Sequence, residues 1–389
     1  MPAQKKQILI LGGGFAGISA IKTLLSQSLD NTEITLITNN SNFEYHAALY
    51  RVVTGHSSKK VSIPLKSIFK TKRLNIVIDR ITHLDLQKQK VTGDAKVSYS
   101  FDYLIIALGS QTNYYNIKGL RVNSYQLKSL ADAQKLKQHI EAMIDQSVKN
   151  PTPCLHFSIV GGGPTGIELA GELGNFVKNQ TCKHHTSCKC LQIDLLESSN
   201  TLLGNFDPKI SKIAETRLRN LNVNILKNTH ITRENKDTLF TNIGKLNSKT
   251  VIWVAGVTTH ALLKQSKELV FLPNGKVKIM DNLSVFGFPN VFIAGDNANL
   301  IDTGTAHAAI SHGNFVGEEI LRNIYTKKSH VYKPITSSWA IPIGPSWAVA
   351  KLGPFTLTGY MGWIRRKIID LSFFTTILPF PKALKAILN

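Results

Sequence analysis

Two groups of three glycines are the residues of this chain whose spacing most directly indicates chemistry. Both groups have G-x-G-x-x-G spacing: Gly12, Gly14 and Gly17 form the first, and Gly161, Gly163 and Gly166 form the second. In such a loop the first glycine permits a tight turn, the second lets the backbone approach a pyrophosphate, and the third lets a helix pack against a strand. Each group therefore predicts a bound dinucleotide.

The residues around each loop predict the elements that position it. The apolar segments Gln7–Leu11 and Phe157–Val160 precede the loops and are typical of buried strands, and small residues that favour a helix follow. The N-terminus of that helix would present free N–H groups and the positive end of its dipole to a phosphate. Since one doubly wound sheet offers one such crevice, two loops about 150 residues apart predict two Rossmann-like α/β domains.

The last residue of the following strand indicates which nucleotide binds. An acidic residue there accepts hydrogen bonds from the adenosine ribose and repels a 2′-phosphate. Segment 191–197 ends in Glu197, so we expect the second unit to prefer NADH to NADPH. Segment 33–38 of the first unit ends instead in Thr38, and the amides of Asn39 and Asn40 could replace the missing carboxylate.

Three further strand-like segments end in a glycine, where backbone could approach a ligand. Phe101–Leu108 precedes Gly109, Thr250–Ala255 precedes Gly256, and Val291–Ala294 precedes Gly295 and Asp296.

The composition excludes several classes of protein. Among 389 residues, 43% are hydrophobic and 18% are charged, which argues against a disordered chain. The net charge of +21 should attract phosphates, acidic partners or anionic lipids. The basic residues are spread along the chain without a nucleic-acid-binding motif, so we expect no nucleic-acid partner. Neither a secretory signal nor an uninterrupted apolar run of ~18 residues is found, so we expect a cytoplasmic protein without a spanning helix.

Five segments, taken in order, carry a family resemblance: ILGGGFAGISA, FDYLIIALGSQTNYYNIKG, IVGGGPTGIELAGEL, VIWVAGV and VFIAGDNA. They resemble the type II NADH dehydrogenases, the non-pumping NADH:quinone oxidoreductases of the two-dinucleotide-domain flavoprotein disulfide reductase superfamily. The resemblance covers roughly residues 7 to 325. It implies that the first loop holds FAD, that the second holds NADH, and that hydride passes from the nicotinamide to the flavin. The cofactors carry that chemistry, and the protein supplies position and electrostatics.

The resemblance also implies residue roles. Asp296 of the A-G-D motif is expected near the ribityl and pyrophosphate part of FAD, although an Asp that caps the following helix is the alternative. We expect further cofactor contacts from Phe15, Ala16, Thr38, Gly109 and Gly256. Glu172, four residues after Glu168 and on the same helix face, corresponds to a glutamate near the nicotinamide and quinone that could relay protons; a solvent-facing side chain is the alternative.

The expected quinone pocket departs from the family. Where the family has A-Q-x-A-x-Q-Q-G, residues 306–313 read AHAAISHG, so all three glutamines are replaced. His307 and His312 could donate hydrogen bonds to a quinone oxygen and carry its protons, or they could be surface or core histidines without a ligand. A soluble NADH oxidase or diaphorase is therefore one alternative function. The other is a flavin-carrying redox sensor with its output in a cysteine cluster.

The C-terminal segment predicts contact with an anionic membrane. Apolar residues recur at helical spacing from Tyr360 to Phe374, with Arg365 and Arg366 on another face, and residues 351–389 carry six basic residues against one acidic residue. The alternative is a stripe that packs on its own domain or in a homodimer. The predicted enzyme is peripheral, on the cytoplasmic side of the membrane.

Four cysteines give little further chemistry. Cys182, His184, His185, Cys188 and Cys190 lack the paired C-x2-C spacing of zinc sites, so we predict no metal. No cysteine precedes Cys154 and none follows Cys190, which disfavours disulfide reductase and sulfide:quinone chemistry. The predicted domains are residues 1–115 with 270–330 for FAD, 116–269 for NADH, and 331–389 for membrane docking or dimerisation.

Overall fold

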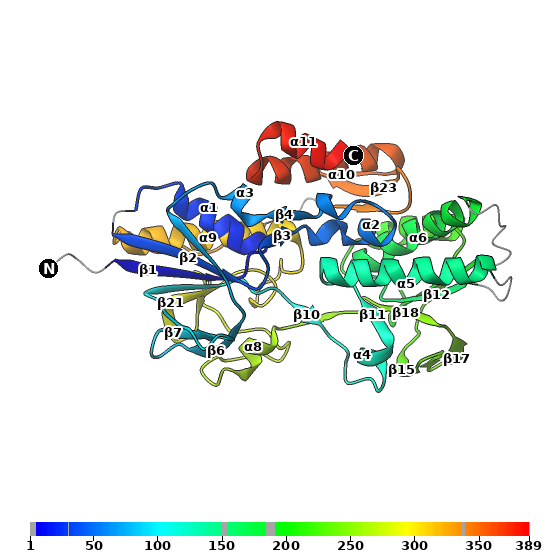
Figure 1. Cartoon of the computed structure of the whole chain (residues 1–389), viewed down its shortest axis with the longest axis horizontal. Coiled ribbons are helices and arrows are strands. Elements are labelled where there is room, and N and C mark those ends of the chain that lie inside the picture. The colour runs from blue at the N-terminus through cyan, green and yellow to red at the C-terminus, as the bar shows by residue number, and fades with distance from the viewer. Residues whose placement is uncertain (1–4, 30, 150–154, 184–190, 336–338, 389) are drawn as a thin grey trace. The chain divides into compact units, whose positions relative to one another are not determined.

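The structure is a computed structural model that describes residues 5–29, 31–149, 155–183, 191–335 and 339–388. The chain forms two compact units, each assembled from three separate stretches of sequence (Figure 1). Unit 1 comprises Met1–Phe43, Ile63–Gln111 and Val257–Ser337, and unit 2 comprises Glu44–Ser62, Thr112–Gly256 and Ser338–Asn389. Compared with the predicted domains, unit 2 takes in the early segment Glu44–Ser62 and the C-terminal segment as well as the second sheet.

Unit 1 is built on a six-stranded sheet with the order β20–β21–β9–β1–β2–β5. Its strands are β1 (Lys6–Leu11), β2 (Thr32–Thr38), β5 (Leu74–Ile78), β9 (Tyr103–Ile106), β20 (Ser284–Val285) and β21 (Phe288–Ile293). All neighbours are parallel except β20 and β21. Residues Ile8–Leu11 are all buried, as expected of a parallel strand that is covered on both faces.

Helices α1 (Phe15–Leu25) and α9 (Ala306–Ile324) pack side by side in unit 1 (Figure 1). Two glycines of α9, one turn apart, allow the close approach. A Cβ on Gly313 would collide with the Ala16 carbonyl, and one on Gly317 would lie 2.8 Å from Cβ of Thr23. This packing brings a late part of the sequence next to the helix that follows the first glycine loop.

Smaller elements complete unit 1. An antiparallel sheet contains β6 (Ile81–Asp85), β7 (Lys90–Gly93) and β8 (Ser98–Ser100), and the short helices are α3 (Leu65–Ile68) and α8 (Ala261–Gln265). Four short strands lie where the chain passes from one unit to the other: β3 (Asn42–Glu44), β4 (Ser62–Pro64), β10 (Gln111–Thr112) and β19 (Val257–Thr258).

Unit 2 contains a five-stranded parallel sheet with the order β11–β18–β12–β13–β14. Its strands are β11 (Ser124–Gln126), β12 (Leu155–Val160), β13 (Leu191–Leu196), β14 (Val223–Leu226) and β18 (Thr250–Trp253), and its helices include α4 (Leu120–Asn123), α5 (Leu130–Lys149), α6 (Pro164–Lys183) and α7 (Pro208–Asn220). A small antiparallel sheet adds β15 (Ile231–Asn235), β16 (Thr238–Thr241) and β17 (Gly244–Asn247). In both units the strand before the glycine loop is central and pairs with the next strand of the sheet, which confirms the prediction of two Rossmann-like α/β domains.

The C-terminal part of unit 2 consists of β22 (Ala340–Pro342), β23 (Ala348–Leu352), β24 (Phe355–Leu357), α10 (Gly359–Ile377) and α11 (Phe380–Leu388). Helix α10 packs on β22, β23 and α11. The segment Glu44–Ser62 of the same unit contains η1 (His46–Ala48), α2 (Leu49–Val53) and η2 (Ser58–Lys60), and α2 packs on α5 and α6. Of the helices in the described part of the chain, none has the length and apolar character that a membrane span requires.

The structure divides the apolar stripe predicted for α10, because Phe374 packs inward on the same face as Arg366. Its buried residues are Gly362, Arg366, Asp370, Phe374 and Ile377, so Arg366 lies on the packed face. Tyr360 and Ile368 of the predicted apolar stripe are 61% and 50% exposed. The reason is a set of buried hydrogen bonds to the Arg366 guanidinium, described below, that an apolar pattern cannot reveal.

Candidate functional site

The first glycine loop has the geometry that its spacing predicts. Gly12 has a φ of +104°, which favours glycine, and a Cβ on it would collide with the carbonyl of Ala107, the residue that follows β9. A Cβ on Gly17 would collide with the Gly12 carbonyl, so this glycine lets α1 begin directly against the loop. A Cβ on Gly14 would meet none of the described atoms within 4 Å. The open side at Gly14 is where a pyrophosphate could approach the backbone.

The second loop repeats this arrangement. Gly161 has a φ of +120°, and a Cβ there would lie 2.8 Å from the Ala255 nitrogen. A Cβ on Gly166 would collide with the Gly161 carbonyl, whereas one on Gly163 would meet no described atom within 4 Å. The N–H groups of Gly12 and Gly161 also donate to equivalent carbonyls, those of Ile37 at 2.9 Å and Leu196 at 2.8 Å. The two loops are thus equivalent by sheet position, contacts and open side.

Glu197, which follows β13 directly, and Thr38, the last residue of β2, occupy equivalent places. Glu197 Oε2 accepts a hydrogen bond from the Gly162 N–H at 2.7 Å, and Oε1 accepts one from the Ser199 N–H at 2.8 Å. The carboxylate therefore lies directly beside the second loop. Thr38 is buried, and its Oγ1 lies 3.4 Å from where a Cβ on Gly13 would be. A neutral hydroxyl stands beside the first loop where unit 2 has a charge.

The A-G-D segment returns to the first loop's side of unit 1. Ser110 Oγ donates to Asp296 Oδ2 at 2.6 Å, and the Gly304 N–H donates to Oδ1 at 3.2 Å. Gly109 and Gly295 have φ values of +64° and +87°, so both need a conformation that favours glycine. Asp296 is not needed to cap the following helix. Thr305 is the N-cap of α9, and its side chain accepts a hydrogen bond from the Ala308 N–H.

Asn297 is a residue of this site that the sequence analysis missed. It is fully buried, its Nδ2 donates to the Gly109 carbonyl at 2.9 Å, and its Oδ1 accepts from the His260 N–H at 3.1 Å. A polar side chain with that burial fixes the loops on either side of it. The only signal in the sequence was its position directly after Asp296.

Three other residues that were predicted to contact a cofactor, Phe15, Ala16 and Gly256, each have different surroundings. The Phe15 ring packs edge-on against Phe43, with ring centroids 5.1 Å apart. Ala16 is buried where α1 meets Gly313. Gly256, in unit 2, has a φ of +90° and lies against the Tyr115 hydroxyl, which leaves no room for a side chain.

The two predicted quinone histidines differ in environment. His312 is buried, its Nδ1 accepts from the Gly295 N–H at 3.1 Å, and its Nε2 lies 3.1 Å from Asp302 Oδ1. Since Nδ1 must be an acceptor, Nε2 carries the proton and donates to Asp302. Both ring nitrogens are therefore engaged inside unit 1. His307 is exposed and lines a surface hollow with Ser311, Asn314 and Tyr332.

Burial lowers the pKa of His312, against the opposing effect of Asp302. The folded state thus takes up the His312 proton at lower pH than the unfolded chain, whose ordinary value is 6.5. This contribution to stability is present above the unfolded pKa of 6.5, and it is lost as the pH falls from there through the lower folded pKa. We expect the melting temperature to fall as the pH is lowered from about 7.5 to about 5.5, and to fall less steeply in the His312→Gln variant. Thermal unfolding followed by circular dichroism measures both slopes, and parallel slopes would contradict the assignment.

Glu168 and Glu172 of α6 share a helix face in unit 2. Glu168 is buried, and its Oε1 accepts from Arg366 Nη1 at 3.1 Å. Burial raises the pKa of Glu168 to about 7, against the opposing charges of Arg366 and Arg51. Glu172 is half-buried, and burial raises its pKa too, against Arg51. Glu172 is thus only partly exposed to solvent.

Arg366 joins α6, α10 and the segment before α2. Its Nε donates to Asp370 Oδ1 at 2.8 Å, its Nη1 also donates to the Ala340 carbonyl at 3.0 Å, and its Nη2 donates to the Ala47 carbonyl at 2.7 Å. Tyr45 Oη donates to the same Asp370 oxygen at 2.7 Å. This buried network explains why α10 turns Arg366 inward.

Comparison with known proteins places the chain in a family. A sequence profile of the pyridine nucleotide-disulphide oxidoreductases matches residues 6–313. The chain belongs to the pyridine nucleotide-disulphide oxidoreductase family. Despite the family name, no cysteine precedes Cys154, and Cys154, His184, His185, Cys188 and Cys190 lie outside the described residues, as does the side chain of Cys182.

Within this family the chain is similar to two type II NADH:quinone oxidoreductases. It is 25% identical to Ndh of Mycobacterium tuberculosis over 397 residues, which cover 96% of this chain and 85% of the relative. It is 26% identical to the protein of Staphylococcus saprophyticus over 387 residues, which cover 95% of each chain.

Two solved structures of similar fold span nearly the whole chain. NDH2 from Plasmodium falciparum, in complex with NADH, has a TM-score of 0.86 and 20% identity, covering 98% of this chain and 97% of that one. The sulfide:quinone oxidoreductase from Aquifex aeolicus has a TM-score of 0.81 and 16% identity, covering 96% and 91%. At these identities the likeness concerns the fold.

Proposed function

We propose that this chain is a type II NADH:quinone oxidoreductase, which transfers electrons from NADH through FAD to a quinone without pumping protons. The observation that carries this function is the pair of equivalent glycine loops, one in each unit. The relatives of that name, which align over 95% or more of this chain, support it.

The residues of unit 1 fit FAD. The backbone is open at Gly14 and Gly109, where a Cβ would meet none of the described atoms within 4 Å, so a ligand could lie close to the chain there. Asp296, held by Ser110, can accept hydrogen bonds from ligand hydroxyls. Bound FAD would supply two-electron chemistry between NADH and the quinone. We assign Gly12, Gly14, Phe15, Ala16, Gly17, Thr38, Gly109, Gly295 and Asp296 to this site.

The residues of unit 2 fit NADH. Gly163 is open, and Glu197 lies beside the loop where a ribose would bind. We assign Gly161, Gly163, Gly166, Glu197 and Gly256 to this site. These residues hold and orient the nucleotide, and none of them needs to form a covalent bond.

Replacing Glu197 should narrow the preference for NADH over NADPH. Glu197→Gln removes the charge that repels a 2′-phosphate and keeps an oxygen for the Gly162 N–H, so the loop should stay in place. We expect the ratio of kcat/KM for the two nucleotides to fall about ten-fold, close to 1.4 kcal/mol. Glu197→Ala should also lower this ratio, but it would remove the hydrogen bond to the Gly162 N–H as well. A ratio that does not change in either variant would refute the role of Glu197.

Glu172 is our candidate for moving a proton during quinone reduction. Its carboxyl has a pKa raised by burial, which brings it closer to neutral pH, where a proton relay works best. Of the two histidines, His307 is the one whose ring lies at the surface. His312 accepts a hydrogen bond from the Gly295 N–H and donates one to Asp302. We therefore propose that it holds the A-G-D segment in position and does not contact the quinone.

We also propose peripheral binding to the cytoplasmic face of an anionic membrane through α10 and α11. Exposed apolar side chains of these helices, Tyr360, Met361, Ile368 and Phe380, support this, as does the basic charge of the segment. The alternative is that a second copy of this chain covers the same surface. Sedimentation in the absence of lipid would detect such a homodimer.

Anaerobic mixing of the purified, flavin-loaded protein with NADH tests the function. NADH should bleach the flavin, NADPH should do so more slowly, and a short-chain quinone should restore the colour. Failure to bleach would overturn the function. Bleaching without re-oxidation by quinone, but with rapid re-oxidation by oxygen, would favour the NADH oxidase.

A further inference from the structure

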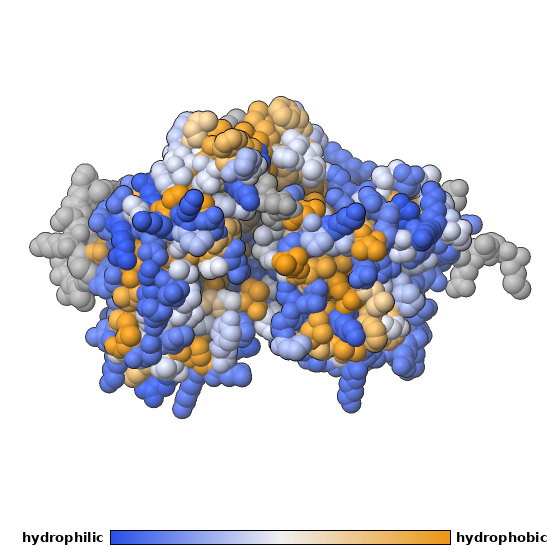
Figure 2. All heavy atoms as spheres, turned by 180° about the vertical axis from the view of Figure 1, so that it is seen from behind, coloured by the Kyte–Doolittle hydropathy of each residue, from blue (hydrophilic) through white to orange (hydrophobic). Residues whose placement is uncertain are grey.

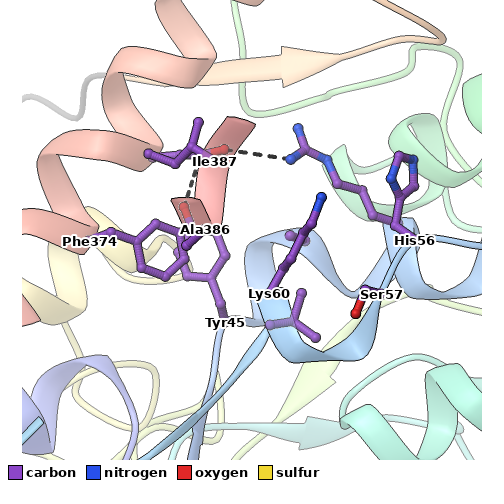
Figure 3. A pocket seen from close by; sticks show the side chains of 11 residues that line it. Tyr45, His56, Ser57, Lys60, Phe374, Ala386 and Ile387 are labelled. Carbon is purple, nitrogen blue, oxygen red and sulfur yellow. Dashed lines mark hydrogen bonds and ion pairs between the residues drawn. The ribbon is translucent and has the colours of Figure 1, made fainter. Parts of the chain in front are cut away.

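Unit 2 has a pocket whose lining includes three basic side chains. It lies between the segment Tyr45–Val61 and the helices α10 and α11, and Figure 3 shows His56 and Lys60 on one side of it and Phe374 and Ile387 on the other. Arg51 and Asp370 also line it. No residue of this pocket belongs to either glycine loop.

The carboxylate in the lining is already engaged. Asp370 Oδ1 accepts hydrogen bonds from Tyr45 at 2.7 Å and Arg366 at 2.8 Å, and Oδ2 lies 3.9 Å from Arg51 Nη1. Arg366 is itself a cation, so Asp370 is shared between two guanidinium groups. It leaves little negative charge for the other basic side chains.

Those basic side chains repel one another. Burial, together with the charges of Arg51 and Lys60, lowers the pKa of Lys367 to about 8 against the opposing effect of Asp370. Burial and then Arg51, Lys60 and Lys367 lower the pKa of His56, and burial and then Arg51 lower that of Lys60. Of these groups, Arg51, His56 and Lys60 line the pocket itself. An anion in the pocket would relieve the repulsion.

The two helices that line the pocket also carry apolar side chains. Phe374 and Ile387 are in its lining, and Lys367, whose Nζ donates to the Ile387 carbonyl at 2.8 Å, connects α10 to the end of α11. On these two helices Met361 and Phe380 are 59% and 60% exposed. Figure 2 shows apolar side chains over the C-terminal helices at the top of that view. A ligand with a charged head and apolar chains matches this combination better than free phosphate does.

We propose that this pocket binds the phosphate of an anionic phospholipid, with Arg51, His56 and Lys60 around the headgroup and the acyl chains along α10 and α11. The proposal rests on the proposed peripheral membrane binding and adds a specific headgroup site to it. An arginine can hold a phosphate through two parallel N–H donors, and lysine adds a mobile charge. Diffuse attraction to a charged surface needs no such pocket.

Binding of a monomeric short-chain lipid separates the pocket from diffuse attraction. Calorimetric titration of the full, flavin-loaded chain with dihexanoylphosphatidylglycerol, below its micelle concentration and without NADH or quinone, offers no charged surface. Lys60→Gln should weaken binding about ten-fold, the effect of one lost charge-assisted hydrogen bond. His56→Gln is the second pocket variant and should also weaken it.

The matched control is Lys385→Gln, which removes the same charge from an exposed position of α11. Its affinity should stay within about two-fold of the unsubstituted protein, since no pocket contact is lost. Equal losses in Lys60→Gln and Lys385→Gln would overturn the site. Inorganic phosphate should bind more weakly than the lipid, and equal affinity would overturn the lipid as occupant. If NADH bleached the flavin normally but the lipid did not bind, this proposal alone would be refuted. If the lipid bound but NADH did not bleach the flavin, the proposed enzyme alone would be refuted.

Discussion

Gly17→Ala is expected to yield a protein that is purified without flavin. The Cβ of alanine would collide with the Gly12 carbonyl, and Gly12 cannot move aside freely because its own Cα faces the Ala107 carbonyl. The loop and the start of α1 must therefore shift, at a cost of about 1–3 kcal/mol. A shift of that kind also moves the backbone N–H groups out of the position in which they would face the pyrophosphate. Flavin absorbance per protein after purification measures the loss.

Gly14→Ala is the matched control for this loop. A Cβ at Gly14 would meet none of the described atoms within 4 Å, so the flavin-free protein should keep its stability within about 0.5 kcal/mol. Affinity for FAD should nevertheless fall, because the methyl group fills the space through which a pyrophosphate approaches. If Gly17→Ala bound FAD normally, or if Gly14→Ala unfolded the protein, the loop would not be the site.

The second loop extends this test to the nucleotide. Gly166→Ala creates in unit 2 the same collision, with the Gly161 carbonyl. We expect this variant to retain flavin and to lose bleaching by NADH. The two substitutions would then separate the two cofactor sites by chemistry.

The glycine loops could be predicted from sequence because their geometry is local. The spacing of Gly12, Gly14 and Gly17 determines which Cβ atoms would meet the backbone within the same turn. Glu197 was also predictable, since the end of the next strand in a Rossmann sheet lies beside the loop. These inferences need only one βαβ unit.

Arg366 and His312 could not be placed from sequence because their partners are distant. The Arg366 guanidinium bonds to Glu168, 198 residues away, and to the Ala47 carbonyl, 319 residues away. A helical pattern of apolar residues says nothing about such partners, so it could not predict that Arg366 is buried. His312 likewise looked like a ligand-binding donor until Gly295 and Asp302 accounted for both its nitrogens.

Replacing Arg366 should destabilise unit 2 more than most single substitutions would. Arg366→Met leaves the buried carboxylates of Glu168 and Asp370 without their shared cation and the carbonyls of Ala47 and Ala340 without a donor. Breaking a buried ion pair in this way costs about 3–5 kcal/mol. All four tryptophans, Trp253, Trp339, Trp347 and Trp363, lie in unit 2, so urea unfolding followed by tryptophan fluorescence reports on this unit. Lys382→Met, at an exposed position, should change stability by less than about 0.5 kcal/mol.

The pH dependence identifies the carboxylate responsible. The folded pKa of Glu168 is about 7, above its ordinary 4.5, so its contribution to stability is present below pH 4.5 and is lost as the pH rises through 7. Arg366 opposes this rise, so its removal should widen the window and make the penalty larger at about pH 8 than at about pH 5. Adding Glu168→Gln to Arg366→Met removes the buried charge, and it should recover part of the stability and flatten the pH dependence. If the double variant were no more stable than Arg366→Met at about pH 8, the cost would lie in the carbonyls or in Asp370 and not in Glu168. Since Glu168 lies one helical turn before Glu172, the same cycle shows whether the Arg366 network holds the proposed proton-carrying face of α6 in place.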